Sequence, residues 1–344
     1  MKKFFLLLTI ACIGFIARAQ TKDEPYLTKS LSGSNLTEVM ARTSGGSITV
    51  SGGAGQDARI EVYVRSNNSK DRLSKEEIKK RIEDDYNFSV EVTGGKLSAV
   101  ARQKINFKNW KRALSFSFKI YVPKNVSTDL ATSGGSIHLS DLTGSQQFRT
   151  SGGSLHIDNL NGKIDGRTSG GSIHIADSHE DIDLHTSGGS INAEDCSGTI
   201  NLGTSGGSVR MSDLDGNIKA RTSGGSVHGD DIKGELNAHT SGGRVDLQGL
   251  RGSVDASTSG GSMHVELLEL GKYVTIHNSS GNVDLTMPGK KGMNLKLRGG
   301  RVRTSTLNNF SGKMDDDEIT GTINGGGVPV NVRSSGGRIT LTIK

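Results

Sequence analysis

The sequence has little of several residue types that globular cores commonly use. Its 344 residues include two cysteines and one tryptophan, and aromatic residues make up 4% of the chain. Cys12 lies in the N-terminal apolar segment described next, so Cys196 is left as a single thiol and an internal disulfide is excluded. With few large side chains to fill an interior, we expect a thin, flattened core that has no room for a ligand cavity.

Beyond the N-terminus, the sequence also lacks long apolar runs and a large charge of one sign. Residues 4–16 are apolar, follow Lys2 and Lys3, and precede Ala17-Arg18-Ala19, which is the pattern of a secretory signal peptide. We predict cleavage after Ala19 and export to the periplasm, the outer envelope surface or the medium. No transmembrane segment is expected in the mature chain. Its formal charge falls from +6 to +3, which is too small to predict a nucleic-acid partner.

What the sequence does have is a short, regular repeat. The phrase Thr-Ser-Gly-Gly-Ser, once ending in Arg, returns every eighteen residues, at Thr132, Thr150, Thr168, Thr186, Thr204, Thr222, Thr240 and Thr258. Each unit holds two segments in which apolar and polar residues alternate, as they do in half-buried strands. A unit this short must stack on its neighbours to bury its apolar face. The pattern therefore predicts an all-β fold: a parallel β-solenoid (single-stranded β-helix) of 18-residue coils with two short strands each, capped at both ends.

In-register stacking assigns each position of the repeat to a column that runs along the rod. We predict two inward columns on the first strand and its corner: Ile137, Leu155, Ile173, Ile191, Val209, Val227, Val245 and Met263, and Leu142, Leu160, Ser178, Cys196, Leu214, Ile232 and Leu250. Cys196 is therefore expected to be a buried structural thiol. The facing column on the second strand has mostly small residues, namely Gly166, Ala220, Ala238 and Ala256. Larger side chains occupy it at Phe148, Leu184 and Leu202.

Two turns complete each predicted coil. We expect the Ser-Gly-Gly turn to need glycine for a positive φ. The opposite corner has an outward column of Asp141, Asn159, Asp177, Asp195, Asp213 and Asp231. Calcium binding by this column is one interpretation, but Asn159 and Gly249 interrupt it, so we favour Asp side chains that bond nearby backbone amides.

Histidines share outward columns too, one with His138, His156, His174, His228 and His264, the other with His185, His239 and His277. No acid or thiolate completes a tetrahedral metal set in either column, so we interpret both as polar strand faces. No metal site, cofactor or catalytic residue is predicted.

These patterns divide the sequence into four segments. Residues 1–19 form the signal peptide, and residues 20–131 a strand-rich N-terminal cap with a short helix at about 74–86, opened by the capping box that begins at Ser74. Residues 132–284 hold the regular repeats, and residues 285–344 hold irregular coils and a C-terminal cap.

One loop of the N-terminal cap combines aromatic and basic residues. Lys108, Trp110, Lys111 and Arg112 lie together there and suit an anionic or sugar ligand through charge and stacking. The alternative is a hairpin loop whose aromatic side chains cover the core of the cap. We name these four residues as the candidate ligand-binding site.

Several of these segments resemble the bacterial putative-adhesin domain family, a β-solenoid domain of unknown function with TSGGS-type repeats. The resemblance rests on residues 118–126 (FKIYVPKNV), on the repeats from Thr132, and on Gly325-Gly326-Gly327 leading into residues 335–339 (SGGRI). It covers the chain from about Thr43 to the end. It implies an exported β-solenoid and brings no catalytic residues.

Three classes of function remain open. A non-catalytic, adhesin-like binding or scaffolding protein leads, because a rod with polar faces and no pocket offers mainly contact area. Its partner would be an envelope or extracellular macromolecule, and its oligomeric state stays open. A glycan-binding protein is the alternative, supported by the loop at Trp110 and by a basic stripe of Arg149, Lys163, Arg167, Lys219 and Arg221. A β-helical polysaccharide-active enzyme is least favoured, because the eighteen-residue period leaves no room for long loops to wall an active site.

Overall fold

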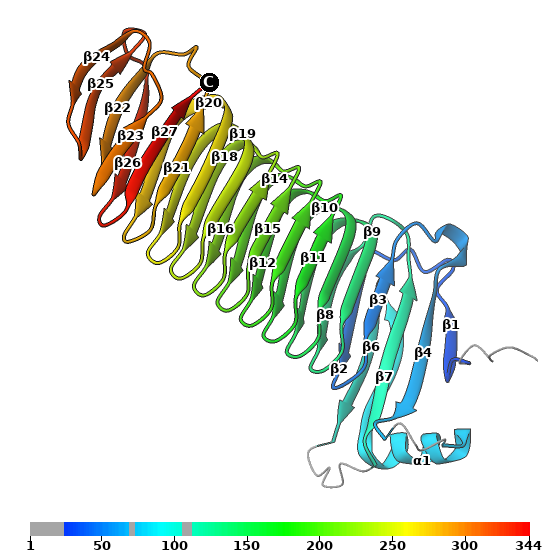
Figure 1. Cartoon of the computed structure of the whole chain (residues 1–344). Coiled ribbons are helices and arrows are strands. Elements are labelled where there is room, and N and C mark those ends of the chain that lie inside the picture. Colours follow the sequence, from blue (N-terminus) through cyan, green and yellow to red (C-terminus); the bar gives the residue numbers. More distant parts are fainter. Residues whose placement is uncertain (1–23, 69–72, 105–111) are drawn as a thin grey trace, which may run out of the picture.

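The structure, a computed structural model, describes residues 24–68, 73–104 and 112–344, which form a long β-rod (Figure 1). Its strands run across the rod and stack along it, so the backbone of each coil bonds to the next. We call the face built from the strands after each Gly-Gly turn the short-strand face, and the opposite face the long-strand face. The predicted fold class, a parallel β-solenoid, is confirmed.

The regular coils contribute twelve strands to this rod. Four coils have a four-residue strand and an eight-residue strand, and in the other four coils one bent strand serves both faces. The strands are β9 (Ile137–Thr150), β10 (Leu155–Thr168), β11 (Ile173–Ala176), β12 (His179–Thr186), β13 (Ile191–Glu194), β14 (Ser197–Thr204), β15 (Val209–Ser212), β16 (Asp215–Thr222), β17 (Val227–Asp230), β18 (Lys233–Thr240), β19 (Val245–Thr258) and β20 (Met263–Asn278). Ile173 pairs with Ile191 and Ile182 with Ile200, which is the predicted parallel register.

Both predicted inward columns are buried, from Ile137 to Met263 and from Leu142 to Leu250. Cys196 is among them, and burial raises the pKa of its thiol to about 11, so it is the expected structural thiol. The repeated threonines are also buried. Thr150 Oγ1, for example, donates to Gly135 O of the preceding coil (2.8 Å) and accepts from Gly153 N (3.3 Å). The same pair of bonds recurs in the following coils, so each threonine ties its own turn to the previous one.

The glycines of the Ser-Gly-Gly turns are required for a reason other than the one expected. In the regular repeats they do not have a positive φ. The second glycine instead lies against the preceding coil: a Cβ on Gly171 would come within 2.0 Å of Gly153 O. The prediction of positive φ at these turns was therefore wrong, and close packing of successive turns explains the glycine.

The left-handed backbone lies at the opposite corner. Asp141, Asn159, Asp177, Asp195, Asp213 and Asp231 have φ between 49° and 58°. Asp and Asn tolerate this conformation better than other non-glycine residues. Among the described residues no backbone amide donates to these side chains, and Asn159 bonds to Asp141 Oδ1 instead (2.7 Å). The expected amide bonding was therefore wrong, and the tolerance of Asp and Asn for positive φ accounts for the column.

At the N-terminal end, the order of coils in space differs from their order in the chain. The elements are β1 (Leu27–Ser30), β2 (Glu38–Thr43), β3 (Ile48–Ser51), the 3-10 helix η1 (Gly55–Asp57), β4 (Arg59–Ser66), α1 (Lys75–Asp85), β5 (Tyr86–Thr93), β6 (Lys96–Gln103), β7 (Leu114–Tyr121) and β8 (Ser127–Thr132). Strand β2 lies between β6 and β8, and β3 lies between β7 and β9, all in parallel. The coil formed by residues 38–51 is thus inserted between two later coils. Antiparallel β5, β4 and β1 cover the end.

Helix α1 lies at this covered end (Figure 1). Ser74 Oγ accepts a hydrogen bond from Glu77 N (3.2 Å), as its capping box predicts. Ile82 is buried and Ile78 packs against the core.

The C-terminal end repeats the same arrangement. Its strands are β21 (Val283–Met287), β22 (Met293–Arg298), β23 (Arg301–Thr304), β24 (Phe310–Met314), β25 (Glu318–Ile323), β26 (Val328–Ser334) and β27 (Arg338–Ile343). Strand β26 lies between β20 and β22, and β27 lies between β21 and β23. The last coil in the chain is therefore inserted before the end of the rod, and antiparallel β25 and β24 close that end.

Candidate functional site

A groove follows the edge where the long-strand face meets the Thr-Ser-Gly-Gly turns. It has a volume of about 1050 Å³, and its cationic lining consists of Arg42, Arg102, Lys104, Arg149 and Arg167. These residues come from β2, β6, the segment after β6, β9 and β10, so the groove crosses from the N-terminal coils into the regular repeats. We call it the edge groove.

The cations of the edge groove come mainly from one position of the repeat, the residue before each turn threonine. We call it the cation column. Parallel register aligns Arg149 with Arg167, Arg167 with His185, and Arg221 with His239. A second hollow of about 540 Å³, lined by His185, Arg221 and His239, continues the edge groove along the rod. No aspartate or glutamate among the described residues lines either hollow.

Some of these cations form ion pairs with carboxylates of the adjacent outward column. Arg167 pairs with Asp165 (3.1 Å) and Asp183 (3.2 Å), and Arg42 pairs with Asp129. Arg149 and Arg221 are exposed and form no ion pair with any described residue. Their guanidinium groups are therefore free to bind an anion.

Hydroxyl groups form the other wall of the edge groove. Ser133, Ser151, Ser169, Ser187 and Ser205 line it in a column, one from each successive turn. Their side chains make no hydrogen bond to any described residue, whereas the neighbouring threonine hydroxyls are used within the fold. The serine hydroxyls can therefore donate to a ligand or accept from it.

The histidines of the groove do not complete a hydrolytic triad. His239 Nδ1 shares a hydrogen bond with Ser257 Oγ, but among the described residues no carboxylate bonds to its other ring nitrogen. His185 Nε2 bonds to Asp183 (2.9 Å), again without a serine partner within the described part of the chain. A Ser-His-Asp arrangement needs all three groups connected, so neither histidine is placed for nucleophilic catalysis.

A different pair of histidines stacks on the short-strand face. The rings of His138 and His156 are 4.6 Å apart and nearly parallel. Burial, with a smaller effect from His156, lowers the pKa of His138, and its buried Nδ1 has no hydrogen-bond partner among the described residues. Within residues 24–68, 73–104 and 112–344, no three His, Cys, Asp or Glu side chains lie close enough together to hold a metal ion.

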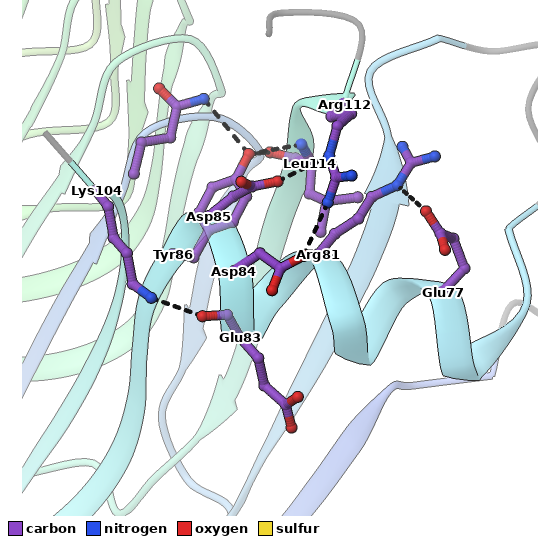
Figure 2. Close-up of polar contacts among 10 residues, drawn as sticks. Glu77, Arg81, Glu83, Asp84, Asp85, Tyr86, Lys104, Arg112 and Leu114 are labelled. Carbon is purple, nitrogen blue, oxygen red and sulfur yellow. Dashed lines mark hydrogen bonds and ion pairs between the residues drawn. The ribbon is translucent and has the colours of Figure 1, made fainter. Parts of the chain in front are cut away.

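Of the four predicted ligand-binding residues, Lys108, Trp110 and Lys111 lie outside the described residues. Arg112 lies beside the C-terminal end of α1, where it pairs with Asp84 (3.2 Å) and Asp85 (3.1 Å) (Figure 2). The hydrogen bond to Asp85 is the main cause of its raised pKa. The C-terminal end of a helix carries a partial negative charge, so the carboxylates of Asp84 and Asp85 are unfavourable there. The positive charge of Arg112 offsets this repulsion.

The other side of the same loop is also attached to α1. Lys104 N donates to Asp85 O (2.9 Å), and Lys104 Nζ donates to Glu83 O (2.6 Å) (Figure 2). Leu114 N donates to the hydroxyl of Tyr86 (2.7 Å). Arg112 therefore has a structural role in this cap, and its predicted role in binding a ligand stays a prediction.

Sequence reasoning found part of the edge groove. Arg149, Arg167 and Arg221 of the predicted basic stripe share the cation column, but Lys163 and Lys219 occupy other outward columns. The groove residues that it missed are Arg42, Arg102 and the turn serines, and Lys104 was not among the four selected. One signal was available, since Arg-Thr-Ser-Gly-Gly begins at Arg42, Arg149, Arg167 and Arg221.

The fold and its edge groove define a β-solenoid with an extended polar groove. Residues 176–342 match the model of the Toastrack family DUF4097. The same repeat continues upstream of the match, to β9 and β10. None of the curated proteins matches this chain.

Two solved structures are similar to the chain. One is a putative cell adhesion protein from Clostridium sporogenes ATCC 15579, with 12% identity, coverage of 92% of this chain and 98% of that one, and a TM-score of 0.20. The other is a putative adhesin from Bacteroides fragilis NCTC 9343, with 14% identity, coverage of 92% and 96%, and a TM-score of 0.25. No helix in the described part of the chain has the length and apolar character needed to cross a membrane.

Proposed function

We propose that this protein is an exported, non-catalytic, adhesin-like rod that binds or scaffolds a macromolecule of the cell envelope or cell surface. The observation that carries the proposal is the edge groove, a continuous surface of cations and free hydroxyls that crosses many coils. Such a surface suits a long partner, because each coil adds a weak contact and the contacts sum along the rod. The His185–Asp183 and His239–Ser257 pairs each lack the third group of a triad among the described residues, which favours binding over turnover.

A glycan-binding protein that uses the loop at Trp110 is the second candidate. One observation favours it: Lys104, at the base of that loop, is attached to α1 and also lines the edge groove. A ligand in the groove would therefore pass beside the loop's base. The double variant Trp110→Ala plus Lys111→Ala tests this candidate. If the loop binds the glycan, the variant should lose binding, whereas binding by the edge groove alone should be unchanged.

Export is tested in the source organism. Residues 1–19 have the signal-peptide pattern, so we expect the mature protein to begin at Gln20 and to leave the cytoplasm. N-terminal sequencing and fractionation of intact and lysed cells measure both. An intact N-terminus in the cytoplasmic fraction would contradict the proposal.

Binding is tested by co-sedimentation of the purified mature chain, residues 20–344, with washed envelopes of the same organism. We expect saturable binding without release of soluble sugar or peptide. Absence of saturable binding, or release of such products, would overturn the proposed function.

A further inference from the structure

Building on the proposed function, we propose that the edge groove binds a linear acidic polysaccharide that lies along the rod axis. The charge distribution is the first argument. Five cations line the main groove, no carboxylate lines it, and Arg149 and Arg221 have no ion-pair partner among the described residues. Guanidinium groups bind carboxylate and sulfate groups through paired hydrogen bonds, so they suit the acidic groups of such a polymer.

The serine column supplies contacts that match the rest of a sugar chain. Each turn of the main groove presents one free hydroxyl beside the cation column, for example Ser151 beside Arg149 and Ser169 beside Arg167. A saccharide offers hydroxyl groups that both donate and accept hydrogen bonds, as serine does. The groove can therefore bind the acidic groups on one side and the sugar hydroxyls on the other.

The spacing of the contacts favours a polymer over a single small anion. Successive coils are about 4.8 Å apart, so Arg149 and Arg221, four coils apart, are separated by roughly 19 Å. One small anion cannot reach both residues. A chain that contacts several coils gains affinity from each, and longer chains should bind more tightly.

The composition of the groove argues against two other polyanions. Among the described residues, no Phe, Tyr or Trp side chain lines either hollow, and single-stranded nucleic acids bind proteins largely by stacking bases on such rings. The described lining residues also include no large apolar side chain, which a protein surface uses to insert into an anionic membrane. A carbohydrate needs neither feature.

The test uses the mature chain and three acidic polysaccharides: polygalacturonate, alginate and heparin. Arg149→Gln plus Arg221→Gln removes two of the cations that have no ion-pair partner among the described residues. Arg210→Gln plus Arg244→Gln is the matched control, because it removes the same charge from exposed residues that line neither hollow of the edge groove. Isothermal titration measures affinity at low and high salt, and thermal melting checks that both variants fold.

We expect at least one of the three polymers to bind, with affinity that rises with chain length and falls with salt. The groove variant should bind about tenfold more weakly, and the control should stay within about twofold of the parent protein. Binding of none of the three, equal losses in both variants, or equal binding of neutral dextran would overturn the inference.

Three further measurements test this inference, and the last of them also separates it from the proposed function. Tighter binding of a single-stranded oligonucleotide or of anionic phospholipid vesicles, with the same dependence on Arg149 and Arg221, would also overturn it. If envelope co-sedimentation is unchanged in the groove variant, the polysaccharide inference fails and the proposed function stands. If the parent protein itself does not bind envelopes, the polysaccharide inference and the proposed function both fail.

Discussion

The regular repeats and the two ends of the rod use the same coil in different ways. In the repeats each coil bonds to the coil 18 residues away, as Ser154 does with Ser136. At the ends the partner is much farther along the chain: Ser140 bonds to Ser51, 89 residues away, and Arg338 bonds to Asn282, 56 residues away. Local contacts can form coil by coil, whereas an inserted coil must close a long loop first.

The ends also solve a problem that the repeats do not have. Every interior coil covers its neighbours, but a terminal coil exposes unpaired backbone groups to other chains. At both ends antiparallel strands cover this edge, β5 and β4 at one end and β25 and β24 at the other. The comparison teaches that repetition builds the length of this rod and that non-local strands close it.

The largest expected effect comes from breaking the uniform core. Val227 is fully buried, so Val227→Asp places an unpaired charge among packed side chains and should cost about 4 kcal/mol or more of unfolding free energy. His228→Asp, at the next and outward-facing position, should change it by less than about 1 kcal/mol. Denaturant unfolding followed by circular dichroism measures both. Similar losses would contradict the register.

Removing the inserted C-terminal coil should have a large but local effect. Deletion of residues 328–344 takes away β26 and β27, which separate the coil of β22 and β23 from the rest of the rod. We expect hydrogen exchange to lose protection across residues 283–327 and to keep it across residues 155–240, because repeats depend on their nearest neighbours. Full protection of residues 283–327 in the truncated protein would show that the insertion is not needed.

A smaller change tests the contact between successive turns. A Cβ on Gly171 would lie 2.0 Å from Gly153 O, so Gly171→Ala should destabilise the protein by about 2 kcal/mol. At Gly170 the nearest atom is 3.5 Å from a Cβ, so Gly170→Ala should change stability little. Thermal and denaturant unfolding compare the two variants. Equal stabilities would mean that the turns are not in close contact.

The smallest expected effect concerns pH and the stacked histidines. The pKa of His138 is lowered in the folded protein, first by burial and then by His156. Above the ordinary value of 6.5 both states are neutral, but below it the unfolded chain takes up a proton that the folded chain resists. Stability should therefore fall from pH 7 to pH 5, by less than about 1 kcal/mol after solvent screening.

His138→Asn removes the group that causes this loss, so its melting temperature should fall less over the same pH range. The measurement is a series of thermal melts from pH 7 to pH 5 on both proteins. An identical fall in the variant would assign the pH dependence to other groups.

Much of the fold and part of the candidate site could be read from the sequence. The eighteen-residue period and the alternation within each unit determined the parallel coils, the inward columns and the burial of Cys196, because stacking identical units leaves one register that buries every apolar position. The cation column was visible in part, at Arg149, Arg167 and Arg221, since equivalent positions of a repeat must align.

Only the tertiary structure decided the rest. The sequence does not show that residues 38–51 and 328–343 are inserted between other coils, because that pairing joins segments far apart in the chain. This insertion brings Arg42 into line with Ala131 and Arg149 and extends the groove across the N-terminal coils to Arg102. The backbone conformations were equally hidden: whether glycine serves a positive φ or a close approach depends on the neighbouring coil, which only the packed structure supplies.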